Sequence, residues 1–205
     1  MTAPPEPAWP GWTVADPRHE VALILVDVIN AFFDRRGAFH YDAAPNVLPA
    51  LKRLLAEARA GGRLVVHARE AHRPALADLE GIKLPPHCFP GAVDAEPVPG
   101  FEARRGEVEI RKRRYSAFFG TDLALLLREQ GARRVVVAGV KTNVCIRATV
   151  QDAFAHGFEP ILAPDAVGSN RPHLHEASLE DVERYFGRVV PLDEAAALLR
   201  GKAAG

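Results

Sequence analysis

The chain has 205 residues, 26 Lys and Arg against 26 Asp and Glu, and 48% hydrophobic residues. This length favours one domain, and the balanced charge argues against nucleic-acid or anionic-membrane partners, which need a basic excess. No apolar run approaches the roughly 20 residues of a membrane helix, and the first residues do not read as a signal peptide. Because two cysteines cannot form a disulfide framework, we expect a cytoplasmic protein.

Residues 1–18 contain five of the 17 prolines and predict an extended arm, with Trp9 and Trp12 as candidate docking side chains. Residues 19–205 are predicted to form a single domain. Short apolar runs at 21–26, 63–67, 134–138 and 158–162 predict strands buried on both faces of a parallel sheet. The run at 107–111 alternates instead, which predicts a strand with one wetter face.

Helical patterns lie between and after these strands. Apolar spacing, caps and terminal glycines predict helices over 46–60, 121–130, 143–156, 174–186 and 193–200. Strands that alternate with helices predict right-handed crossovers and an α/β fold with helices on both faces of the sheet. The long interval from Glu70 to Gly106 is rich in Pro and Gly, which is typical of a functional rim or an oligomer contact.

Three reactive residue types follow predicted strand ends, where ligands gather in an open parallel sheet. Asp27 closes the first strand, Lys112 ends the alternating strand, and Cys145 falls in the first turn of the helix after the strand at 134–138. Taken singly, each has an ordinary structural role as a cap, a solvated charge or a core thiol. A helix N-terminus and a nearby lysine favour the thiolate of Cys145, whereas Cys88 in the long loop is expected to be structural.

Together these groups can cleave an amide. Asp27 can accept the proton of the Cys145 thiol if burial raises the pKa of the carboxylate, and Lys112 would hold both groups in register. The backbone amide of Cys145, with another from the preceding turn, would form an oxyanion hole. The expected substrate is a small amide or ureide.

Three blocks carry a family resemblance, at residues 25–32 (LVDVINAF), 111–123 (RKRRYSAFFGTDL) and 138–153 (AGVKTNVCIRATVQDA). Over nearly all of residues 20–190 the chain resembles the isochorismatase-like cysteine hydrolases. The resemblance implies an Asp27–Lys112–Cys145 triad and a Rossmann-like three-layer α-β-α fold around a mainly parallel six-stranded sheet. It also implies a homodimer or homotetramer, and a cis peptide between Val140 and Lys141 that directs the amides of Lys141 and Cys145 at the oxyanion.

The resemblance also narrows the activity. Isochorismatases proper generally lack the cysteine, so Cys145 indicates the amide-cleaving branch. Nicotinamidases carry a metal on an Asp-x-His pattern after the second strand. Residues 67–72 read His-Ala-Arg-Glu-Ala-His, so the pattern is missing. His67 and His72 alone could still be ligands, but histidines near a strand end are more often structural, and we expect no metal or cofactor.

The second and third blocks are most similar to ureide hydrolases, including N-carbamoylsarcosine amidohydrolase, ureidoacrylate amidohydrolase and biuret hydrolase. The favoured function is therefore hydrolysis of a carbamoyl or ureido C–N bond through a thioester, with release of ammonia. Three alternatives remain open: a nicotinamidase or maleamate-type amidase, a non-catalytic oligomeric binding protein, and a Cys–His hydrolase whose base is His156, His173 or His175.

The candidate pocket residues lie close to the triad in sequence. The aromatic ones have a plain core role as an equally weighted alternative. Arg147 is a chemically suitable carboxylate clamp, but two residues beyond Cys145 on a helix it faces away, which favours an ion pair with Asp152 or a subunit contact. The candidate substrate-binding residues are Asn30, Phe32, Tyr115 and Phe118.

Overall fold

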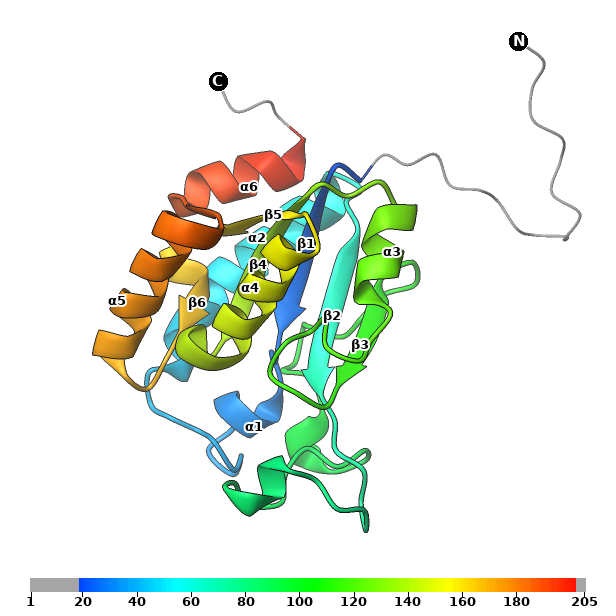
Figure 1. Ribbon diagram of the computed structural model, residues 1–205, viewed down its shortest axis with the longest axis vertical. Coiled ribbons are helices and arrows are strands. Elements are labelled where there is room, and N and C mark those ends of the chain that lie inside the picture. The colour runs from blue at the N-terminus through cyan, green and yellow to red at the C-terminus, as the bar shows by residue number, and fades with distance from the viewer. Residues whose placement is uncertain (1–18, 202–205) are drawn as a thin grey trace, which may run out of the picture.

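A computed structural model describes residues 19–201, which form a parallel sheet between two layers of helices (Figure 1). Six strands pair in the order β3-β2-β1-β4-β5-β7, and a short β6 pairs with β4. Every pairing in this sheet is parallel. The strands are β1 (Val21–Val26), β2 (Val65–Glu70), β3 (Val108–Lys112), β4 (Arg134–Val140), β5 (Glu159–Leu162), β6 (Val167–Gly168) and β7 (Arg188–Val189).

The helices lie on both faces of the sheet, as predicted. They are α1 (Asn30–Phe33), α2 (Leu48–Ala60), α3 (Leu123–Glu129), α4 (Arg147–Ala155), α5 (Pro172–Asp181) and α6 (Leu192–Arg200). Successive residues of β1 point to opposite faces: Leu23 and Leu25 pack in one core with α2 and α6, and Ile24 packs in the other with α3 and α4. Both faces of β1 are buried, which explains its uninterrupted apolar sequence.

The predicted α/β fold with a mainly parallel sheet is confirmed. The structure differs from the prediction only in short strands and helices, and in where some helices and strands begin and end. The two-residue strands β6 and β7 have no detectable period and were not predicted. The predicted helix 143–156 divides into a π-helical segment, Thr142–Ile146, and α4. The most consequential difference is that β2 continues to Glu70, three residues beyond the predicted end at His67.

The predicted arm at residues 1–18 lies outside the described residues. Within residues 19–201, the helices are all too short, or too polar, to traverse a bilayer.

Because all the strands are parallel, their carboxyl ends meet at one edge of the sheet, where α1 and the long segment after β2 lie (lower edge of Figure 1). Gly139 of β4 pairs with Val26 of β1, and a Cβ atom at position 139 would lie 2.0 Å from the Val26 carbonyl oxygen. The φ of Gly139 is also +126°, so only glycine permits this close approach. The approach brings the ends of β1 and β4 together at the edge that carries Asp27.

Candidate active site

The structure brings Asp27, Lys112 and Cys145 together beyond three strand ends. The Lys112 ammonium lies 2.8 Å from Asp27 Oδ2 and 3.6 Å from Cys145 Sγ. The backbone amide of Glu70 donates to Asp27 Oδ1 at 2.8 Å, which fixes the carboxylate from the neighbouring strand. Asp27 has a φ of +54°, a left-handed conformation that is uncommon outside glycine and often marks a functional position.

Burial dominates the electrostatics of these three groups. Asp27 and Lys112 are fully buried, and Cys145 is 4% exposed. Burial raises the pKa of Asp27 although the Lys112 charge opposes it, which makes the carboxylate a stronger base. Lys112 remains an ammonium, because attraction to Asp27 and Cys145 outweighs desolvation and raises its pKa. Asp27 also lies within hydrogen-bonding reach of the Cys145 thiol.

Lys112 favours the Cys145 thiolate, as expected, but the net effect of the surroundings is the opposite. Desolvation raises the pKa of Cys145 well above its ordinary value, and Lys112 offsets only part of that rise. Cys145 occupies the π-helical segment Thr142–Ile146 rather than the first turn of an α-helix. The resting triad is therefore a thiol beside a basic carboxylate and a permanent cation, and the thiol loses its proton only when it attacks.

The peptide bond between Val140 and Lys141 is cis, as the family resemblance implied. Lys141 precedes the π-helical segment, and its carbonyl accepts hydrogen bonds from the amides of Val144 and Ile146. The segment thus folds back over Lys141. The predicted oxyanion donors, the amides of Lys141 and Cys145, both belong to this turn.

The Cys145 side chain opens onto a cavity of about 150 Å³. Phe32 and Tyr115, two of the predicted pocket residues, contribute to its wall. The sequence did not indicate Phe39, between α1 and α2, or Leu84, in the long segment after β2. It also did not indicate Glu70, at the end of β2, or Val144, beside the nucleophile. The complete lining is Phe32, Phe39, Glu70, Leu84, Tyr115, Lys141, Val144 and Cys145.

Two of the predicted pocket residues lie elsewhere. Phe118 packs in the core, with its ring centroid 5.9 Å from that of Phe158 and 5.4 Å from that of His156. Asn30 begins α1 and donates from Nδ2 to the Val93 carbonyl at 3.1 Å, so it holds the long segment after β2. Neither side chain belongs to the lining of the cavity.

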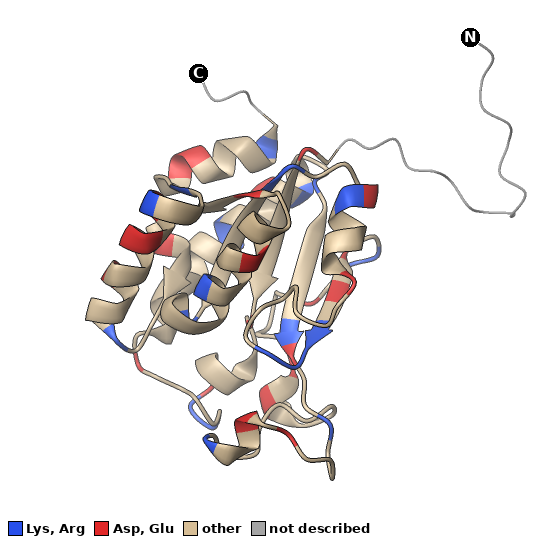
Figure 2. Ribbon diagram, viewed as in Figure 1, with Lys and Arg blue, Asp and Glu red and all other residues tan. Residues whose placement is uncertain are grey.

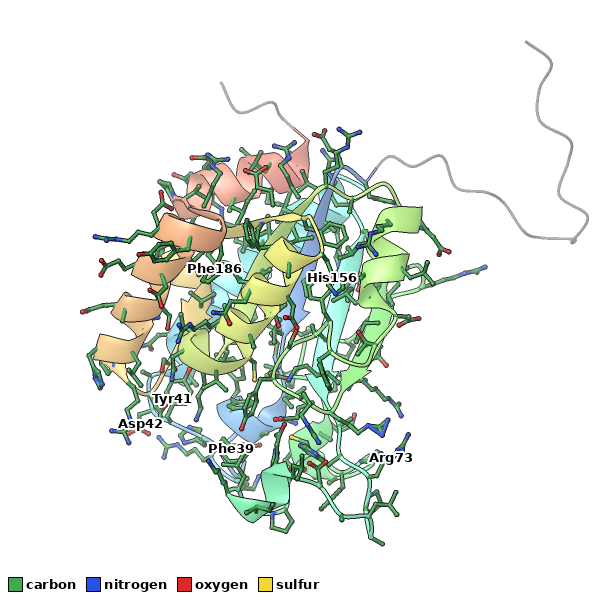
Figure 3. The ribbon with its side chains drawn as sticks, in the orientation of Figure 1. Phe39, Tyr41, Asp42, Arg73, His156 and Phe186 are labelled. Atoms are coloured by element: carbon green, nitrogen blue, oxygen red, sulfur yellow. The ribbon has the colours of Figure 1, made fainter. Side chains whose placement is uncertain are left out.

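The candidate bases of a Cys–His mechanism do not contact the thiol in the described part of the chain. His156 follows α4 at its far end (Figure 3), and its ring packs at a tilt against that of Phe118. His175 bonds Thr142 Oγ1 at 2.9 Å, and His173 is exposed on α5. Arg147 faces away from the thiol as predicted, but its ion-pair partner is Asp181 of α5, at 2.9 Å, rather than Asp152.

Cys88 is fully buried in the long segment, in agreement with its predicted structural role. Its amide donates to Asp94 Oδ2 at 2.8 Å, and its carbonyl accepts from the amide of His72. Desolvation raises the pKa of the Cys88 thiol, which keeps the sulfur protonated and unreactive.

Next to the triad, four buried side chains form a cluster that the sequence analysis missed. Single donor atoms of Glu70, His72, Glu80 and His87 all lie within 4.8 Å of one another. The two histidines approach through their Nε2 atoms at 3.1 Å. Their Nδ1 atoms are held outward by the Asp78 carboxylate at 2.8 Å and the Pro85 carbonyl at 2.7 Å.

These contacts fit a divalent metal ion. A histidine that donates from Nδ1 to an outer acceptor presents Nε2 as a ligand, and both histidines of the cluster are held in that way. Both carboxylate oxygens of Glu80 are buried without a hydrogen-bond partner among residues 19–201. Two imidazoles and two carboxylates form a donor set suited to zinc or a related transition metal.

The signal for this cluster was present in the sequence. The expected pattern was Asp-x-His, whereas Glu70-Ala71-His72 places a longer carboxylate in the same pattern at the end of β2. Ending the strand at His67 hid that relation. His67 itself lies apart from the cluster and bonds Glu107 through Nε2 at 2.8 Å.

Comparisons with known proteins agree with this geometry. Residues 21–194 match the isochorismatase domain. The chain is 38% identical to maleamate amidohydrolase of Pseudomonas putida, over 87% of this chain and 86% of that protein. It is 30% identical to N-carbamoylsarcosine amidase of an Arthrobacter species, over 84% and 68% respectively.

Among solved structures, the pyrazinamidase of Pyrococcus horikoshii in complex with zinc superposes with a TM-score of 0.77 at 33% identity, over 84% of this chain and 99% of that one. The sequence blocks, the doubly covered parallel sheet and the matched domain all lead to the same assignment. The chain belongs to the isochorismatase family.

Proposed function

We propose that the chain is a cysteine-dependent amidohydrolase that cleaves the C–N bond of a small linear amide or ureide and releases ammonia. One observation carries the proposal: a buried lysine lies 2.8 Å from a carboxylate and 3.6 Å from a thiol that opens onto a small cavity. Two relatives, named for maleamate and N-carbamoylsarcosine, supply the reaction type.

The first half of the reaction forms a thioester. As Cys145 Sγ attacks the carbonyl carbon, its proton passes to Asp27, whose raised pKa suits it to act as the base. The amides of Lys141 and Cys145 donate to the oxyanion of the tetrahedral intermediate. Asp27 then returns the proton to the departing nitrogen, and ammonia leaves.

The second half restores the enzyme. Asp27 takes a proton from water as the water oxygen attacks the thioester. When the tetrahedral intermediate collapses to the acid product, Cys145 Sγ departs and takes that proton back from Asp27. Lys112 is a cation throughout, so it stabilises whichever of Asp27 and Cys145 carries the negative charge. Overall, one amide and one water yield one acid and one ammonia.

The four-residue cluster of Glu70, His72, Glu80 and His87 would hold a metal ion beside this triad. A bound divalent ion acts as a Lewis acid that polarises an oxygen of a ligand. Glu70 links the two sites, because its backbone amide fixes Asp27 and its residue lines the cavity. We propose that the cluster is a metal site that helps to position the substrate, while Cys145 remains the nucleophile.

The test is ammonia release by the purified chain from a panel of ureides, N-carbamoyl amino acids, maleamate and nicotinamide. Both amides and ureides belong in the panel, because the two relatives named above differ in this respect. Cys145→Ser should abolish release, and Cys88→Ser should leave it unchanged. The proposal fails if Cys145→Ser retains activity, or if no compound in the panel yields ammonia.

Thiol labelling gives a second test that needs no substrate. Iodoacetamide should modify one sulfur per chain at near-neutral pH, because Cys145 opens onto the cavity and has Asp27 beside it as a base, whereas Cys88 is fully buried. Cys145→Ser should block that modification. A non-catalytic protein that merely retains the fold should show no such selective reaction. We also propose a homodimer or homotetramer, which light scattering of the purified chain would test.

A further inference from the structure

The Lys141 side chain faces the same cavity as the nucleophile, Cys145. Both residues belong to the cavity lining, four positions apart in one turn. The Lys141 ammonium lies 5.8 Å from the ring centroid of Phe32 and 5.6 Å from that of Phe39, and the two rings stack on each other at 5.7 Å. The aromatic pair therefore holds the cation at one wall of the cavity, with Phe32 in α1 and Phe39 close to it (Figure 3 labels Phe39).

The charge of Lys141 has no ion-pair partner among residues 19–201. The nearest acidic groups, Cys145 and Glu70, act on it only through space, and desolvation lowers its pKa. Aromatic rings stabilise a cation less well than a hydrogen-bonded carboxylate does. Lys141 is also the only cationic residue in the described cavity lining, and Glu70 is the only carboxylate.

We propose that the Lys141 ammonium binds a carboxylate of the substrate, so that the natural substrate is a small acid with a carboxamide or carbamoyl group at its other end. This inference rests on the proposed amidohydrolase function and adds the substrate class. The amide carbon lies against Cys145 Sγ, while the carboxylate lies against Lys141 and away from Glu70. The small volume of the cavity, about 150 Å³, suits a short acyclic acid.

A second group of cations lies at and just beyond the ends of β2 and β3 (blue in Figure 2) but does not face the nucleophile. Arg73, Arg111, Arg113 and Arg114 line a separate hollow of about 350 Å³ that does not include Cys145. Arg73 lies in the loop that follows β2, on the opposite side of the lower edge from Phe39 (Figure 3). The variant Arg73→Gln is therefore a matched control for the loss of a cation near, but outside, the cavity.

The experiment compares maleamate with its uncharged methyl ester as substrates of the full chain. We expect wild-type kcat/KM to be higher for maleamate, and Lys141→Met to reduce the maleamate-to-ester ratio by about ten- to a hundredfold, the loss expected for one charge-assisted hydrogen bond. Lys141→Arg should retain most of the ratio, because it keeps the charge, and Arg73→Gln should not change it.

A binding measurement gives a readout that does not require turnover. In the Cys145→Ser background, calorimetry should show maleamate binding that weakens about ten- to a hundredfold when Lys141→Met is added. Maleate, which lacks the amide, should show the same dependence on Lys141. Circular dichroism of each variant verifies that it is folded.

The outcomes separate the two proposals. Equal efficiency for maleamate and its ester in the wild type, or an equal loss for both in Lys141→Met, would overturn the carboxylate assignment while leaving the amidohydrolase intact. Carboxylate binding that depends on Lys141, without ammonia release from any substrate, would overturn the amidohydrolase instead. Absence of both binding and turnover with maleamate counts against the carboxylate assignment.

Discussion

Replacing Lys112 by methionine would remove the cation that two buried groups share. Asp27 and Lys112 are both fully buried, and their charged atoms lie 2.8 Å apart. Removing one partner of such a pair leaves an uncompensated buried charge and costs about 3–5 kcal/mol. Since a domain typically has about 5–15 kcal/mol of net stability, we expect Lys112→Met to lower the urea midpoint markedly.

The double variant Asp27→Asn/Lys112→Met is the matched control. It removes both charges and keeps the side chains similar in size, so it should recover most of the lost free energy of unfolding. Acidification should also rescue the single variant. Without Lys112 the pKa of Asp27 rises further, because attraction to Lys112 was lowering it; the folded state then takes up a proton as the pH falls, and its stability increases relative to the wild type.

Thiol chemistry provides the functional half of this prediction. Attraction to Lys112 lowers the pKa of Cys145, so Lys112→Met should slow alkylation of Cys145 by iodoacetamide about tenfold or more and abolish ammonia release. The reasoning is refuted if Lys112→Met unfolds at the wild-type urea concentration, or if the double variant is no more stable than the single one. Retained ammonia release would favour a Cys–His mechanism.

Three further predictions concern the scaffold and the cluster beside the triad. Gly139→Ala should lower the free energy of unfolding by about 3 kcal/mol or more, because its Cβ would lie 2.0 Å from a β1 carbonyl oxygen. Gly106→Ala is the control: its φ is also positive but the space around it is open, so it should lose only about 1 kcal/mol. Equal urea midpoints for the two variants would contradict this prediction. Burial alone would raise the pKa of Glu107, but hydrogen bonds, the strongest from Arg59, lower it to about 2. The ionised carboxylate therefore stabilises the fold above pH 4.5, and this stabilisation is lost as the pH falls toward 2. Glu107→Gln should make the urea midpoint vary less between pH 4.5 and 2, and a midpoint that falls as steeply as in the wild type would contradict this prediction. The metal-free chain should bind about one Zn²⁺ by elemental analysis, an uptake that His87→Ala abolishes and His67→Ala preserves, and identical uptake by both variants would disprove the site.

The sequence by itself determined the fold class and the three reactive side chains. Short, uninterrupted apolar runs such as Val21–Val26 favour strands buried on both faces, and their alternation with helical segments favours parallel crossovers. In such a sheet the residues at the strand ends converge. Asp27, Lys112 and Cys145 could therefore be selected before any distance was known.

The tertiary structure decided how those side chains are solvated. A helix N-terminus near a lysine predicts a low pKa for Cys145, but full burial reverses that direction, and burial depends on packing from distant segments. Likewise, Phe118 and Phe32 are equally good pocket candidates in the sequence, and only the packing shows that Phe118 lies against Phe158 in the core while Phe32 faces the cavity.

The cluster of Glu70, His72, Glu80 and His87 depended most on tertiary structure. Its residues come from the end of β2 and from a long segment without a hydrophobic period, so no pattern in the sequence fixed their distances. The position of the Lys141 side chain also depends on tertiary structure, because the turn after β4 and two aromatic rings near α1 together determine it. Local periodicity specifies elements, whereas the meeting of side chains from separate loops is a property of the folded chain alone.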